Sequence, residues 1–248
     1  LVLQGLSAFY ALRGKLETLR DLVEQRLNLA RRQQAPDLLL PAHIALGHTL
    51  LALGEVASAR VHLEQGMAHY SPQPHQSLSF GGGIDPIRSG RCHAALVMWL
   101  LGHPDQAQEN LYEMLTLFEG SSNPYGLPVA LLFAAILHQF RREDSLPLER
   151  AEVAITLSTE RGFPQWLALG IVLRGWVLAG RQQGMAGIAQ IHAGLAAWRA
   201  TGAELLRPYV HGWLAEAYRK VGQTHEGLIV LDEVLATDSR RYAAGGRH

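Results

Sequence analysis

Apolar residues recur at intervals of three and four positions along almost the whole chain, and strand-like alternation is nearly absent. Such spacing puts apolar side chains on one face of an α-helix, which predicts an all-α protein. The helical runs are interrupted at regular places. Gly14 and Gly54 are 40 residues apart, and Gly102 and Gly222 are 120 apart, so each is expected to separate two helices. The same period predicts further breaks near positions 142 and 182.

These breaks divide the chain into about six units with a period of about 40 residues. Each unit is predicted to be a pair of antiparallel helices joined at its break. The units are expected near residues 1–39, 40–87, 88–127, 128–167, 168–207 and 208–238, with a linker over 70–87 and a polar tail over 239–248. Pro41, Pro86 and Pro208 support this phase, because proline is tolerated in the first turn of a helix. A capping-box pattern at Thr201 competes with the start at Pro208, and we expect the later start.

Small residues recur in pairs twelve positions apart, with one member on each helix of a unit. The pairs are Gly47 with Ala59, Ala95 with Ala107, and Ala215 with Gly227. A small residue at a helix crossing lets the ridges of one helix enter the grooves of the other. Because one helix pair cannot bury its own apolar face, the pairs are predicted to stack as an α-solenoid.

The segment WLAEAYRKVGQTHEGLIVL at 213–231 resembles a tetratricopeptide repeat, and the segments at 45–72 and 94–111 continue the likeness. The segments at 62–80, 157–179 and 187–209 resemble the C-terminal repeat region of bacterial multidomain signalling ATPases. In that family a class III adenylate/guanylate cyclase-like domain is often followed by an AAA-type ATPase module and then by the helical array. The resemblance implies a regulatory array that binds partners. Because Leu1 is not a methionine and already fits a helical pattern, we expect a fragment of a longer protein.

Composition and charge narrow the expected chemistry. Lys and Arg together number 22, as do Asp and Glu, whereas nucleic-acid binders usually carry a basic excess. The single cysteine, Cys92, cannot form an internal disulfide, and no apolar run has the length of a membrane span. The twelve histidines form no metal-ligand motif, and no phosphate loop or nucleophile motif occurs. We therefore expect a cytoplasmic protein that is not an enzyme and has no cofactor, metal, nucleic-acid partner or membrane partner.

The candidate binding surface is the groove that the first helices of the units line in tetratricopeptide arrays. The resemblance transfers this role to His48, Leu96, Trp99, Ile136, Phe140, Trp176, Tyr209 and Arg219, with Glu216 and Lys220 beside the last of them. The middle of this surface is apolar and its last unit is polar, which suits an amphipathic helix or an apolar peptide anchored on aromatic rings. The alternative is that these side chains simply pack the core, as apolar stripes at helical spacing usually do.

The expected function is a non-catalytic protein-interaction array within a bacterial cyclase-like or AAA-type signalling ATPase. Its partner would be a protein, a peptide or another domain of the same chain. The alternative is the ligand-sensing helical arm of an ATP-dependent bacterial transcription activator. Apolar residues at both ends, such as Leu6 and Tyr10 in the first helix and Leu228 and Leu231 in the last, also predict self-association.

Overall fold

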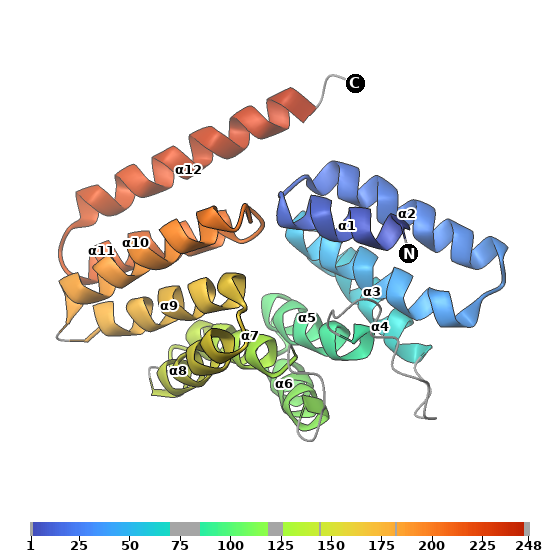
Figure 1. The fold of residues 1–248 in the computed structure, drawn as a ribbon, viewed down its shortest axis with the longest axis horizontal. Helices are drawn as coiled ribbons and strands as arrows, with labels where there is room; N and C mark the ends of the chain where they lie inside the picture. The colour runs from blue at the N-terminus through green and yellow to red at the C-terminus, as the bar shows by residue number, and fades with distance from the viewer. Residues whose placement is uncertain (1, 70–84, 119–125, 144, 182, 246–248) are drawn as a thin grey trace. The chain divides into compact units, whose positions relative to one another are not determined.

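The computed structural model describes residues 2–69, 85–118, 126–143, 145–181 and 183–245, with Ser145 and residues 237–245 described by their backbone alone. Over these residues the chain forms twelve α-helices and no strand (Figure 1). In chain order they are α1 (Val2–Leu12), α2 (Leu16–Arg32), α3 (Pro36–Ala52), α4 (Val56–Ala68), α5 (Pro86–Leu100), α6 (Pro104–Phe118), α7 (Gly126–Phe140), α8 (Ser145–Glu160), α9 (Pro164–Ala179), α10 (Gly184–Ala200), α11 (Arg207–Lys220) and α12 (Thr224–Gly245). The prediction of an all-α fold is confirmed.

The chain divides into two compact units, here called unit 1 (Leu1–Leu137) and unit 2 (His138–His248), and the boundary falls inside α7. In unit 1, α1 packs on α2, α3 on α4, and α5 on α6, while α5 also contacts both α3 and α4. In unit 2, α9 packs on α10, and α11 packs on α12 and contacts both α9 and α10. Within each unit, neighbouring helix pairs therefore rest on one another, which is the stacking that a helical repeat needs to bury its apolar faces.

The breaks between paired helices lie where the period predicts them. The glycines with a left-handed backbone at these breaks are Gly14, Gly54, Gly102 and Gly222, with φ of 63°, 83°, 81° and 81°. Glycine adopts this conformation without the steric cost that a Cβ imposes. Arg142 takes the same conformation with φ of 61°, so the repeat geometry is retained there without a glycine. Gln182 lies outside the described residues, between the end of α9 and the start of α10.

Helix starts follow the prolines with one shift. Helix α5 begins at Pro86, where the Asp85 side chain accepts a hydrogen bond from the Ile87 backbone N–H at 2.9 Å. The second unit, expected to start near residue 40, instead begins its first helix at Pro36, so Pro41 lies inside α3. Of the expected linker over 70–87, residues 70–84 lie outside the described residues.

The last helix pair begins and ends differently from a simple repeat. Helix α11 begins at Arg207, in agreement with the start expected near Pro208. The Thr201 hydroxyl donates to the Trp198 carbonyl at 2.7 Å and accepts from the Ala203 N–H, so it closes α10 rather than capping α11. Helix α12 continues to Gly245 and thus includes part of the segment expected to be a polar tail.

Small residues mark the helix crossings, as predicted. Ala59 and Ala107 are fully buried, and a Cβ added to Gly227 would lie 2.9 Å from the Ala215 carbonyl oxygen. The closest crossing was not predicted. It joins α9 to α10 at Gly175 and Gly187, which are also twelve positions apart. A Cβ on Gly187 would lie 2.5 Å from the Gly175 carbonyl oxygen, so neither position has room for a side chain.

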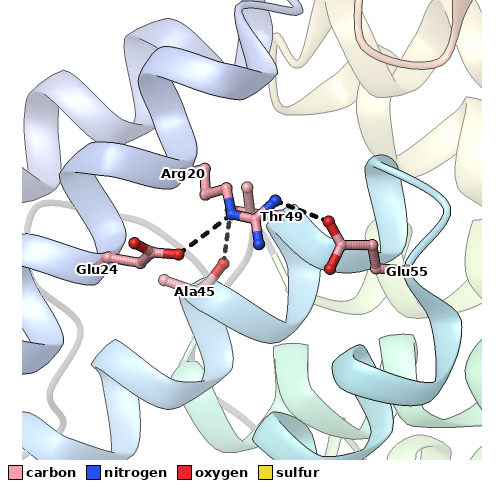
Figure 2. A network of polar contacts seen from close by, with 5 residues as sticks. All are labelled: Arg20, Glu24, Ala45, Thr49 and Glu55. Atoms are coloured by element: carbon pink, nitrogen blue, oxygen red, sulfur yellow. Dashed lines mark hydrogen bonds and ion pairs between the residues drawn. The ribbon is translucent and has the colours of Figure 1, made fainter.

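An ion-pair network fastens α2 to the α3–α4 hairpin in unit 1 (Figure 2). The Arg20 guanidinium donates to the Glu24 carboxylate at 3.1 Å and to the Glu55 carboxylate at 2.7 Å. Because both carboxylates favour the charged guanidinium, they raise the pKa of Arg20. Because these groups are about a third to a half exposed, solvent screening keeps their contribution to stability small. The network fixes geometry more than it adds stability.

Candidate functional site

The predicted groove residues divide between the two units. His48, Leu96, Trp99 and Ile136 belong to unit 1, and Phe140, Trp176, Tyr209 and Arg219 belong to unit 2. Ile136 is 3% exposed and Trp176 is 1% exposed, so both side chains are buried. Arg219 is exposed, and the other five residues are half-buried. The predicted residues are therefore described unit by unit.

In unit 1, aromatic rings form a row across the first helices of three successive repeats. His48 on α3 stacks on His93 of α5, with the ring centroids 3.5 Å apart, and His93 packs against Phe133 of α7 at 4.8 Å. Leu96 and Trp99, one and two turns along α5 from His93, pack against the apolar core of α5, α6 and α7. His93 and Phe133 are 40 positions apart, which is one repeat period, so corresponding positions of adjacent repeats become neighbours.

In unit 2, the carboxylate of Glu216 on α11 interacts with side chains from α9, from α11 and from the turn after α7. The Trp176 indole N–H on α9 donates to one oxygen at 2.9 Å, and the Arg142 guanidinium in the turn after α7 pairs with the other. The Lys220 ammonium lies 3.9 Å from that second oxygen and 3.9 Å from the centre of the Trp176 ring. Ammonium groups over an indole face are attracted by the ring quadrupole, by ~0.5–2 kcal/mol depending on desolvation.

The spacing of the residues explains this convergence. Glu216 and Lys220 are four positions apart on α11, so both side chains lie on the same helix face. Trp176 and Glu216 are one repeat period apart, so the stacking of α11 on α9 brings them together. A buried indole N–H needs an acceptor, and Glu216 provides it. With two cations and one carboxylate, the cluster has a local positive charge.

A second aromatic group adjoins this cluster. The Tyr209 hydroxyl donates to the buried Gln139 side-chain oxygen at 3.1 Å, and the Tyr209 ring lies 4.5 Å from the ring of Trp213 and 5.8 Å from that of Phe140. Burial raises the pKa of Tyr209 well above its usual value, so the phenol stays protonated and remains a donor. We call Phe140, Arg142, Trp176, Tyr209, Glu216 and Lys220 together the Glu216 surface.

An open hollow of about 540 Å³ lies beside the Glu216 surface. Its wall includes Lys220 and Val221 at the end of α11, together with Gly180, Arg181 and Gly184 from the segment that joins α9 to α10. Lys220 belongs both to the Glu216 surface and to the wall of this hollow, so the two adjoin.

The described residues also bear on metal binding, nucleophilic chemistry and membrane insertion. No group of three or more His, Cys, Asp or Glu side chains among them is arranged to hold a metal ion. Cys92 is buried, and burial raises the pKa of its thiol far above the usual value, so it is a poor nucleophile. No described helix is long and apolar enough to cross a membrane.

Sequence reasoning missed some members of both clusters. Helical positions in the first helix of a repeat cannot point to Arg142, because it lies in a turn. Gln139, next to Phe140 on α7, carries no separate signal in the sequence. His93 and Phe133 did carry a signal, since each is an aromatic residue at the same position of adjacent repeats.

Comparison with known proteins supports the fold. No family model matches the chain, and no curated protein matches it significantly. The chain is similar to the solved structure of BtubC (BKLC) from P. vanneervenii, with a TM-score of 0.59 and 13% identity over 94% of this chain and 93% of that one. It is also similar to a chain of the APC/C hetero-tetramer Cut9-Hcn1, with a TM-score of 0.56 and 14% identity over 92% of this chain and 45% of that one.

Both neighbours are tetratricopeptide-like helical repeat proteins, so the chain has a tetratricopeptide-like α-solenoid fold. It spans less than half the length of the second neighbour.

Proposed function

We propose that the chain is a non-catalytic repeat array that binds a protein or peptide on the first helices of its repeats. The observation that carries this proposal is the Glu216 surface, where side chains from α7, α9 and α11 and from the turn after α7 converge. Half-buried rings at Phe140 and Tyr209 supply apolar area, and aromatic residues of this kind dominate binding energy at interfaces.

The charges of this surface support an amphipathic partner. Arg142 has a side chain that is 68% exposed and Arg219 is exposed, whereas the Glu216 side chain is 16% exposed and already accepts from several donors. An amphipathic helix with an apolar face over Phe140 and Tyr209 and acidic residues towards the two arginines matches this arrangement. We do not expect nucleic acid, since the chain as a whole carries no excess of positive charge.

We also propose that the array belongs to a cytoplasmic bacterial signalling ATPase or cyclase-like protein, in which another domain of the same chain can be the partner. The resemblance of the segments at 62–80, 157–179 and 187–209 to that family supports this parent. The reading frame upstream of Leu1 tests it. A cyclase-like domain there supports the proposed parent, whereas a helix-turn-helix domain on either side favours the ligand-sensing arm of a transcription activator.

Self-association through the end helices is part of the same proposal. Leu63 and Leu111 occupy corresponding places on α4 and α6 and are 1% and 2% exposed. Leu231 has the same place on α12 and is 37% exposed, with Leu235 at 64%. At the other end, Phe9 of α1 is 52% exposed. Apolar stripes of this kind bind other surfaces when they meet them.

A displayed library of helical peptides tests the Glu216 surface. Peptides selected on the chain should bind the variants Arg142→Ala and Arg219→Ala about tenfold more weakly, a loss of ~1.4 kcal/mol. The control is Arg32→Ala, which removes an exposed arginine at the end of α2 in unit 1. Fluorescence anisotropy with labelled peptides gives the affinities. Selected peptides that bind all three variants as tightly as the original chain would refute the proposed surface.

A further inference from the structure

Five of the twelve histidines gather in two stacks around α3. His43 stacks on His62 of α4 and on His69, the residue that follows α4, with ring centroids 5.2 Å and 6.1 Å apart. His48, five positions further along α3, stacks on His93 of α5 at 3.5 Å. Because α3 carries one member of each stack, its two neighbours α4 and α5 are both held to it by imidazole rings.

The two stacks do not accommodate two protonated rings each. The Nδ1 atoms of His43 and His62 lie 3.0 Å apart, so one must donate and the other must accept. A doubly protonated pair has no acceptor and places two positive charges in contact. His93 donates from Nδ1 to the Ser89 carbonyl at 2.8 Å, and the Ser89 hydroxyl lies 3.4 Å from His48 Nε2. Protonation of both stacked rings would set two cations face to face.

The surroundings do not compensate for added charge. On α2, Arg31 lowers the pKa of both His43 and His62, while Glu24 acts in the opposite direction on His62 alone. The other charged residues on α4 are Arg60 and Glu64, which form an ion pair with each other.

Around the second stack, burial disfavours charged rings and the Ser89 backbone acts in the opposite direction. On α5, Arg88 pairs with Asp85, and Arg91 pairs with Glu113 of α6. Residues 126–137 of α7, which supply Phe133, contain no charged side chain. The pKa of His93 is lowered to about 4, mainly by burial. The pKa of His48 is also lowered, by burial and by His93.

We propose that these two histidine stacks form an acid-sensitive joint, which holds α3 against α4 and α5 at neutral pH and releases it when the rings become protonated. The joint lies where the second helix pair of unit 1 meets the first helix of the next. His48 is also a member of the aromatic row on the first helices. The described residues of unit 2 contain no comparable stack of histidine rings. Acidification is therefore expected to alter unit 1 and to leave unit 2 unchanged.

Histidine NMR tests the protonation step directly on the full chain. Between pH 7.5 and 5.0, the ring signals of His43, His48 and His93 should not titrate while α3 stays packed. The exposed His103 in the turn before α6 lies outside both stacks and serves as the control ring. Titration of His43 and His93 within this range, with no change in the α3 signals, would overturn the proposal.

Hydrogen exchange tests the release. At pH 5.0, backbone exchange in α3, α4 and α5 should rise at least tenfold more than in α9 and α10, after correction for the intrinsic pH dependence of exchange. The double variant His48→Phe, His93→Phe keeps two stacked rings and removes their charge, so it should reduce this rise. The variant His103→Gln should leave it unchanged. A uniform rise over both units, or a rise that the double variant does not reduce, would overturn the proposal.

Discussion

The α9–α10 crossing allows a sharp test of packing in unit 2. In Gly187→Ala, the added Cβ would lie 2.3 Å from the Ala179 backbone nitrogen and 2.5 Å from the Gly175 carbonyl oxygen. Because these are backbone atoms of the facing helix, no side-chain rotation can relieve the contact. Forcing a methyl group into a packed crossing costs ~1–3 kcal/mol, against a gain of ~1 kcal/mol in helix propensity. We expect a net loss of stability of up to about 2 kcal/mol.

The matched control is Gly212→Ala on α11. Its added Cβ would meet no atom within 4 Å, and its φ is not positive. The same chemical change should therefore stabilise unit 2 by ~0.5–1 kcal/mol through helix propensity alone. Of the five tryptophans, only Trp99 lies outside unit 2, so urea unfolding followed by tryptophan fluorescence reports mainly on this unit.

The two substitutions should move the urea midpoint in opposite directions. A midpoint for Gly187→Ala at or above that of Gly212→Ala would refute the reasoning, because it would mean that α9 and α10 are not in backbone contact at this crossing. A changed slope of the transition with an unchanged midpoint would also contradict it, since the expected effect is on the packed state.

Other predictions follow from the same contacts. Ala107→Leu should overpack the fully buried α5–α6 crossing and lower stability by ~1–3 kcal/mol, as measured by the melting temperature; an unchanged value contradicts this. The pKa of His43 is about 4 in the folded chain and 6.5 as a free group, so the unfolded state binds more protons between these values. Stability should be complete above pH 6.5 and fall with decreasing pH by up to ~1.4 kcal/mol per unit for each such histidine, as shown by urea midpoints. The purified chain should show no ATP hydrolysis and no cyclase activity. Light scattering over a dilution series should show association that Leu231→Asp weakens; a strictly monomeric chain at high concentration contradicts this.

Much of the fold could be predicted from the sequence because local signals and the repeat period agree. Glycine at the breaks supplies the left-handed backbone that ends a helix, and paired small residues mark the crossings. The Gly175–Gly187 crossing has the same twelve-residue spacing as the other pairs. The break between its two helices has no glycine at the expected position, near Gln182, so the usual turn signal is missing there. Without that turn signal, the spacing of Gly175 and Gly187 does not by itself indicate a crossing.

The candidate site was harder to predict, because helical periodicity does not distinguish a groove from a core. Trp176 and Tyr209 are both aromatic residues on first helices, yet Trp176 is 1% exposed and Tyr209 is half-buried. The difference arises because α9 is packed by α8, α10 and α11 together. Such contacts depend on residues of three other helices, so no local pattern on α9 could reveal them.

The repeat period does contain information about the site that local patterns lack. Leu96, Ile136, Trp176 and Glu216 are spaced 40 residues apart and occupy the same position in four successive repeats. Stacked repeats place such positions side by side, as the 2.9 Å hydrogen bond from Trp176 to Glu216 shows. The first three residues are apolar and the last is Glu216. Trp176, one period before Glu216, has a buried indole N–H that requires an acceptor. A carboxylate that interrupts an apolar row one period after a tryptophan therefore predicts a hydrogen bond between repeats, and this reasoning finds the centre of the Glu216 surface from sequence spacing alone.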